Sequence, residues 1–147
     1  MAEVKQLPKR HEIQEEMTWD LKLIFESDEA FEQELKEVSG LAGEVKALQG
    51  TLGTSGEALL KGIEKVLEVN RKLEKVYVYS HLKNDQDTAN STYQTMHDKS
   101  LAVLTQIREA SSWFNPEVLA IPEATLAAYM EETEGLHAYK HLIDDLT

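Results

Sequence analysis

Apolar side chains recur every three or four residues along most of this 147-residue chain, and this spacing limits the possible folds more than any other feature. The first such series contains Phe31, Leu35, Val38, Leu41, Ala42, Val45 and Leu48. Because a helix brings residues at these spacings to one face, the series predicts an amphipathic helix. Ser27 or Asp28 is suited to cap its start, and Gly50 is suited to end it.

A second series predicts a helix that begins after Ser55, a good N-cap residue. Its members alternate between steps of four and three residues: Leu59, Ile63, Val66, Asn70, Leu73 and Tyr77. Asn70 is the polar member, and we interpret it as a buried residue that fixes helix register rather than as a catalytic group. The polar stretch 83–90 predicts the link to the next helix.

A third series predicts a helix that ends at Asn115-Pro116, because the residue before a proline is disfavoured in the helical conformation. Its apolar side contains Tyr93, Met96, His97, Leu101, Leu104, Ile107 and Phe114. Pro122 then stands at a helix-start position, and Leu126, Tyr129 and Met130 follow it in a short helix. After Gly135, a last helix contains Leu136, Tyr139, Leu142, Ile143 and Leu146.

These patterns predict an all-α fold, an antiparallel helical bundle of long helices with short connections. The last helical pattern reaches Thr147 without the Gly, Asn, Lys or Arg that commonly closes a helix. We therefore expect the bundle to be truncated at the C-terminus. Residues 1–114 are predicted to form an N-terminal helical domain, and residues 115–147 to begin a second helical segment.

Charge and composition exclude several classes of protein. The chain has 27 acidic and 15 basic residues, and its formal net charge of −12 predicts neither a nucleic-acid partner nor binding to an anionic membrane. It contains no apolar run long enough for a transmembrane helix and no signal peptide, so we expect a cytoplasmic location. The absence of cysteine excludes disulfides and thiolate chemistry.

Two histidine patterns partly match metal-binding motifs. His11-Glu12 begins a His-Glu-x-x-His-like sequence, but its fifth position is Glu15, so the second imidazole is missing. His137 and His141 stand four residues apart, a spacing that could bring both imidazoles to one metal on a helix. Glu134 adds one Glu-x-x-His motif, whereas a di-iron bundle needs two. We predict structural roles for these histidines.

The other candidate sites also favour structural interpretations. Asp85-Gln86-Asp87 resembles the start of a calcium loop, but Asn90 and Met96 replace the required Gly and Glu. Gly53-Thr54-Ser55-Gly56 could bind an anion at a helix start, although helix caps often have this composition. We assign His81, His97, Trp19 and Trp113 to the core. The residues alone therefore predict no catalytic, cofactor-binding or metal-binding site in this chain.

An ordered series of short segments resembles the start of bacterial oligoendopeptidase F. The first segments are Leu7-Pro8-Lys9-Arg10, Thr18-Trp19-Asp20-Leu21, Ile24-Phe25 and Ser27-Asp28-Glu29-Ala30-Phe31. Gly50-Thr51-Leu52-Gly53, Val76-Tyr77-Val78-Tyr79-Ser80, Asp85-Gln86-Asp87-Thr88 with Asn90, and Tyr93-Gln94 follow in the same order. Pro116-Glu117-Val118-Leu119-Ala120-Ile121-Pro122 and Tyr139-Lys140-His141 complete the series. The resemblance therefore spans essentially the whole chain.

The resemblance implies a role within a longer thimet-oligopeptidase-like zinc metallopeptidase that hydrolyses short oligopeptides. The family's His-Glu-x-x-His site would lie after Thr147, so no catalytic residue transfers to this sequence and none of its residues is expected to bind zinc. This segment would help to enclose the substrate channel, and its principal partner would be its own C-terminal catalytic domain. An apolar helix face left bare by that domain is expected to promote self-association.

A second interpretation is a stand-alone acidic helical module that binds other proteins and has no enzymatic activity. Composition alone favours this module, whereas the ordered segments favour the peptidase. The two interpretations differ in what the coding sequence contains after Thr147: a stop codon, or several hundred residues with a His-Glu-x-x-His motif. A metal-binding bundle that uses His137 and His141 is a third interpretation, in which zinc or nickel would raise the melting temperature.

Overall fold

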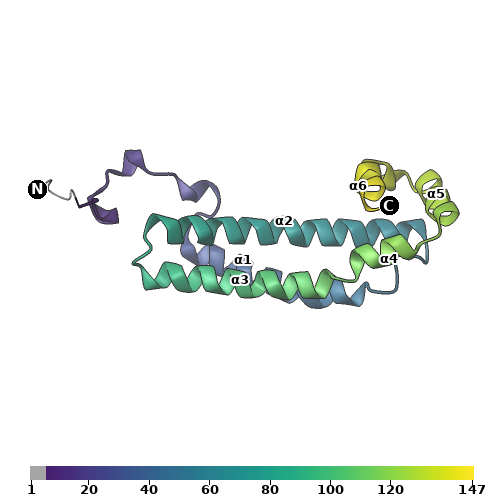
Figure 1. The fold of residues 1–147 in the computed structure, drawn as a ribbon, viewed down its shortest axis with the longest axis horizontal. Coiled ribbons are helices and arrows are strands. Elements are labelled where there is room, and N and C mark those ends of the chain that lie inside the picture. The colour runs from purple at the N-terminus through teal and green to yellow at the C-terminus, as the bar shows by residue number, and fades with distance from the viewer. Residues whose placement is uncertain (1–5) are drawn as a thin grey trace, which may run out of the picture.

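The computed structural model describes residues 6–147, and every regular element within them is helical. The three long helices are α1 (Asp28–Ala47), α2 (Gly56–Gln86) and α3 (Ser91–Ser111). Each packs against the other two, and the chain reverses direction between successive helices (Figure 1). This arrangement confirms the predicted all-α antiparallel bundle. None of the helices in this part of the chain has the length and apolarity needed to span a membrane.

The beginnings of the first two long helices confirm the capping predictions. Ser27 Oγ accepts a hydrogen bond from the Ala30 amide at 3.1 Å, and Ser55 Oγ accepts one from the Ala58 amide at 3.0 Å. Each bond pairs an amide that has no partner within its own helix. After α1, the chain turns at Gly50, whose φ of 87° lies in the left-handed region that favours glycine.

The predicted link at residues 83–90 is too long at its N-terminal side. Helix α2 continues to Gln86, and only residues 87–90 connect it to α3. Lys83 remains in the helix, with its Nζ over the rings of Tyr79 (5.5 Å) and Tyr93 (5.2 Å). His81 Nε2 also lies 3.2 Å from Asp85 Oδ2, one helical turn away. Side-chain contacts of this kind favour the helix where composition alone suggests a turn.

The predicted end of the third helix at Pro116 is wrong. Helix α3 ends at Ser111, and a separate helix, α4 (Phe114–Ala120), contains Pro116 in its first turn. A proline fits there because the first amides of a helix have no intrahelical acceptor. Phe114 therefore belongs to α4.

The C-terminal elements lie at the end of the bundle where α2 begins (Figure 1). Helix α5 (Glu123–Glu132) starts directly after Pro122, as predicted. The last predicted helix is divided into a 3₁₀ helix, η4 (Glu134–Tyr139), and α6 (Lys140–Leu146). Both α5 and η4 contact α2, and α4 contacts α6.

The predicted apolar stripes on α2 and α3 are confirmed in part, since Leu59, Ile63, Val66 and Leu73 of α2 and Met96 and Ile107 of α3 are buried. On α2 the fully buried positions include Val69 and Val76, whereas Asn70 is exposed and the prediction of a buried register residue is wrong. On α3 the buried positions are Met96, Ser100, Val103 and Ile107, and Leu101 is 38% exposed. The additional buried positions arise because each helix packs against two neighbours and therefore buries a wider arc than one stripe.

The predicted aromatic and imidazole core residues have mixed outcomes. Trp113 is 9% exposed, as predicted, but Trp19 is 84% exposed and does not belong to the core. His81 is exposed and His97 is only partly buried, so neither is a core histidine.

Candidate functional site

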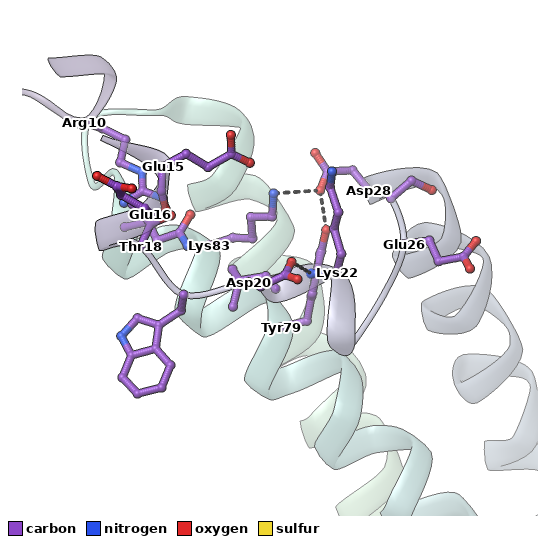
Figure 2. A pocket seen from close by; sticks show the side chains of 14 residues that line it. Arg10, Glu15, Glu16, Thr18, Asp20, Lys22, Glu26, Asp28, Tyr79 and Lys83 are labelled. Atoms are coloured by element: carbon purple, nitrogen blue, oxygen red, sulfur yellow. Dashed lines mark hydrogen bonds and ion pairs between the residues drawn. The ribbon is translucent and has the colours of Figure 1, made fainter. Parts of the chain in front are cut away.

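A strongly charged cavity lies where the N-terminal segment passes the end of the bundle. Three short 3₁₀ helices form this segment: η1 (Arg10–Glu12), η2 (Glu15–Met17) and η3 (Leu21–Leu23). With the start of α1 and the end of α2 they enclose about 640 Å³. Figure 2 shows its charged lining, which comprises Arg10, Lys22, Lys83, Glu15, Glu16, Asp20, Glu26 and Asp28.

Asp28, the first residue of α1, is the centre of the polar contacts in this cavity. Its Oδ1 accepts a 2.7 Å hydrogen bond from the Tyr79 hydroxyl and lies 3.5 Å from Lys83 Nζ (Figure 2). The carboxylate also lies at the positive end of the α1 dipole. These contacts connect the start of α1 to the last turns of α2.

An aromatic cluster beneath the cavity joins the N-terminal segment to the bundle. The Phe25 ring packs edge-on against Phe31 and Tyr79, with centroid distances of 6.1 and 5.2 Å. Phe31 and Tyr79 are stacked at 5.4 Å. Lys75 Nζ lies 4.5 Å from the centroid of Phe25 on its outer side. The segment is therefore anchored by buried rings, while Trp19 remains at the surface.

Burial, and then the hydrogen bond to Asp28, raise the pKa of Tyr79 well above its usual value. A tyrosine held neutral in this way is a hydrogen-bond donor at neutral pH and not a base. The cavity thus carries charged groups that can bind a ligand. The Tyr79 hydroxyl in it is already paired with Asp28 and has a structural role.

We predict that Tyr79 makes the fold sensitive to alkali. The folded state retains its proton while unfolded tyrosine ionises near pH 10, so the contribution to stability is complete below about pH 10 and decreases as the pH rises further. In Tyr79→Phe this alkaline loss should diminish, at a cost of about 1 kcal/mol at neutral pH from the lost hydrogen bond. Urea unfolding across this pH range measures both effects. Equal alkaline slopes in the two proteins would contradict the assignment.

The histidine candidates from the sequence do not come together. His11 lies in η1, where Glu12 accepts a hydrogen bond from the Lys9 amide. His137 and His141 are both exposed and belong to different elements, η4 and α6. His137 Nε2 lies 2.7 Å from the Met130 carbonyl oxygen. In residues 6–147, no three His, Asp or Glu side chains are grouped so that they could hold a metal ion.

The candidate calcium loop at Asp85-Gln86-Asp87 and the candidate anion site at Gly53-Thr54-Ser55-Gly56 both consist of residues with structural roles. Asp85 and Gln86 belong to the last turn of α2 rather than to a loop. In the connector before α2, Ser55 is the N-cap, and the Tyr129 hydroxyl donates a 2.8 Å hydrogen bond to the Gly53 carbonyl oxygen. Gly56 packs closely against Thr133. The start of α2 is thus covered by the residues around α5.

Sequence reasoning missed a second carboxylate contact, at the opposite end of the bundle. Glu117 of α4 accepts hydrogen bonds from the Gly50 amide through Oε1 (2.5 Å) and from the Leu52 amide through Oε2 (3.1 Å). One side chain therefore pairs two amides in the connector between α1 and α2. Glu117 and its partners Gly50 and Leu52 lie in segments that resemble oligoendopeptidase F. That resemblance is the one feature of the sequence that singles these residues out.

The resemblance segments form contacts in the fold. Asp28 and Tyr79 come from two of them and meet at one end of the bundle. Gly50, Leu52 and Glu117 come from two others and meet at the opposite end. Segments that are individually short therefore correspond to specific tertiary contacts.

Comparison with known proteins gives matches across the chain. No family model matches it. Oligopeptidase PepF of Bacillus subtilis is 38% identical over the whole chain, which spans 22% of that relative. Group B oligopeptidase PepB of Streptococcus agalactiae is 35% identical over 93% of the chain, and the match spans 23% of PepB. The chain therefore spans less than a quarter of the length of these curated relatives.

Two solved structures share the fold. The crystal structure of oligoendopeptidase-F from Enterococcus faecium matches 82% of this chain with a TM-score of 0.76 and 37% identity. A putative peptidase from Chlamydophila abortus matches 96% of it with a TM-score of 0.84 and 28% identity. The match spans 24% of each solved chain. These matches confirm the predicted resemblance and the helical fold.

Proposed function

We propose that this chain is the non-catalytic helical part of a zinc metalloendopeptidase that hydrolyses short oligopeptides. The reason is its homology to the N-terminal region of oligoendopeptidase F. The observation that carries the proposal is the extent of the match. The homology covers the whole chain but only 22% of the Bacillus subtilis relative, so most of that peptidase has no counterpart here. We place the reaction in the missing part.

The contacts of the described residues support a structural role. Asp28 Oδ1 and both carboxylate oxygens of Glu117 form contacts between elements, and Tyr79 is held neutral by burial and by Asp28. Zinc, when bound in the full-length enzyme, would activate water for attack on the peptide carbonyl. The residues described here do not offer a ligand set for it. We assign the metal to the sequence after Thr147.

The proposal extends to the surroundings of this region in the full-length protein. Residues 1–114 would form one helical domain, and residues 115–147 would lead into the catalytic domain. Together they would form part of the enclosure around a channel for oligopeptides, in a cytoplasmic enzyme. The catalytic domain would be the principal partner of this chain.

The proposal predicts that peptide hydrolysis requires the sequence after Thr147. The 147-residue chain and the full-length protein are compared on a quenched fluorescent oligopeptide, each with added zinc and with a chelator. We expect hydrolysis by the zinc-supplied full-length protein alone. Hydrolysis by the 147-residue chain would disprove its non-catalytic role, and an inactive full-length protein with zinc would disprove the peptidase assignment.

A further inference from the structure

A groove of about 700 Å³ runs between α2 and α3 and ends at α4. Its apolar lining comprises Val66, Leu73, Tyr77, Leu104 and Phe114, and its polar lining comprises Asn70, Glu74, Arg108, Ser111, Ser112 and Asn115. Val66, Leu73 and Phe114 are buried in its floor, whereas Tyr77 and Leu104 are partly exposed.

The groove lies on the face of the bundle opposite α1. Lys72 of α2 pairs with Glu34 of α1 at 3.6 Å, and Asn70 and Glu74 in the groove each lie two residues from Lys72. Two residues correspond to about 200° around a helix, so these side chains point away from α1. In the view of Figure 1, α1 packs behind α2 and α3.

Helix α3 shows the same division into two sides. Gln106 Oε1 accepts a hydrogen bond from Ser39 Oγ of α1 at 3.0 Å. Leu104 and Arg108, which line the groove, each lie two residues from Gln106 and therefore on the opposite side of the helix. The groove is thus a face of the α2–α3 pair that α1 does not cover, and it has both apolar and polar lining residues.

The rim of the groove carries both signs of charge. Glu74 stands on the α2 side and Arg108 on the α3 side, and both are exposed. Neither forms an ion pair with another residue in the range 6–147. An apolar floor between polar rims matches the faces of an amphipathic helix.

The geometry favours a helix over an extended peptide. An extended peptide gains affinity chiefly by pairing its backbone with an exposed strand edge, and α2 and α3 already use their amides and carbonyls internally. A helix satisfies its own backbone and needs only side-chain packing. The groove follows α2 from Val66 to Tyr77, about 17 Å at 1.5 Å per residue, which is the length of a three-turn helix.

Three packed rings lie at one end of the groove. Tyr77 stacks on the His81 ring with centroids 5.7 Å apart and 8° between the planes. The His97 ring of α3 lies 5.9 Å from Tyr77 and 5.4 Å from His81. These ring contacts join α2 and α3 at this end of the groove.

We propose that, in the full-length protein, the α2–α3 groove is covered by a helix of the same polypeptide from the sequence after Thr147. The inference rests on the proposed function, because the relatives have more than three quarters of their length outside the matched region. A second copy is the weaker occupant, since it would bring together two chains of net charge −12. The groove would thereby join this helical region to the rest of the peptidase.

Photo-crosslinking identifies the occupant directly. Benzoylphenylalanine replaces Asn70, an exposed residue of the groove, in the full-length protein, and mass spectrometry identifies the cross-linked peptide. We expect an intramolecular product with a peptide from beyond residue 147. A product with a second copy, a product within residues 6–147, or no product would overturn the proposal.

A pair of matched variants adds an independent readout. Asn70→Arg introduces a bulky charge into the groove, and Gln33→Arg introduces the same charge at an exposed site on α1. Asn70→Arg should lower the melting temperature of the full-length protein by several degrees and leave that of the 147-residue chain unchanged, whereas Gln33→Arg should change neither. Equal effects of Asn70→Arg on both lengths, or no effect on the full-length protein, would overturn the proposal.

Peptide hydrolysis by the same unmodified full-length preparation separates the two proposals. An active enzyme whose groove forms no cross-link to the sequence after Thr147 retains the proposed function and refutes the groove assignment. An inactive protein with that cross-link retains the groove assignment and refutes the proposed function.

Discussion

Phe31→Ala is expected to lower the free energy of unfolding by about 3–5 kcal/mol, the usual cost of removing a buried phenylalanine ring. Phe31 has no exposed surface, and its ring packs against the rings of both Phe25 and Tyr79, which also touch each other. Because these rings come from the N-terminal segment, α1 and α2, the cavity would open where three parts of the chain meet. Urea unfolding followed by circular dichroism measures the change.

Leu23→Ala is the matched control for this prediction. Leu23 also belongs to the N-terminal region, but it is 86% exposed, so its truncation should change the unfolding free energy by less than about 0.5 kcal/mol. Phe31→Leu keeps an apolar side chain in the cavity and should cost less than Phe31→Ala. A loss below about 1 kcal/mol for Phe31→Ala would show that the aromatic cluster does not carry the packing assigned to it.

Gly56→Ala is expected to destabilise the fold by about 1–3 kcal/mol, as overpacking of a closed site does. A Cβ at this position would meet Thr133 Oγ1, and Thr133 Cβ and Tyr129 Cβ would lie only 3.2 and 3.3 Å away. The last two atoms are attached directly to the backbone, so α5 itself would have to move. The substitution therefore tests how tightly the C-terminal helices pack against the start of α2.

Gly40→Ala should have the opposite sign. Gly40 lies within α1, and apart from its chain neighbours and the adjacent helix backbone nothing lies within 4 Å of the Cβ that alanine would add. The substitution should stabilise the protein by about 0.5–1 kcal/mol, because glycine loses more backbone entropy than alanine in a helix. If Gly56→Ala also stabilises the protein, the contact between α2 and α5 is looser than described.

Local features of the sequence predicted the long helices well. Ser27 and Ser55 cap α1 and α2 because their hydroxyls reach amides three residues ahead, and Gly50 ends the turn after α1 because it tolerates a positive φ. These effects depend on neighbours within one helical turn. The error at Pro116 has the same local origin, because a proline that stops one helix can also stand in the first turn of the next.

The full extent of the buried helix faces could not be predicted from single helices. The stripes through Asn70 and Leu101 have helical spacing, yet both residues are at the surface of this region. The spacing of apolar residues indicates which side of a helix is apolar, but not where the neighbouring helices pack against it. Trp19 shows the same limit, because its size suggests a core anchor while Phe25 and Leu21 occupy the buried positions of the N-terminal segment.

The contacts of the candidate site were harder to predict from the sequence than the helices, because they join residues that are far apart in the chain. Tyr79 and Asp28 are 51 residues apart, and Glu117 lies 67 residues from Gly50, so no spacing rule connects either pair. The sequence contained these residues within segments similar to oligoendopeptidase F, which indicated the family without revealing the contacts.

By itself, then, the sequence determined the helical fold, the starts of α1 and α2 and the similarity to oligoendopeptidase F, because helical spacing, capping and sequence identity can each be read along the chain. Only the tertiary structure decided which faces are buried, how Asp28 and Glu117 join distant segments, and where the α2–α3 groove is open. The physical reason is that burial and side-chain pairing depend on how the helices rotate and align against one another. That arrangement minimises the free energy of the whole bundle rather than of any one helix.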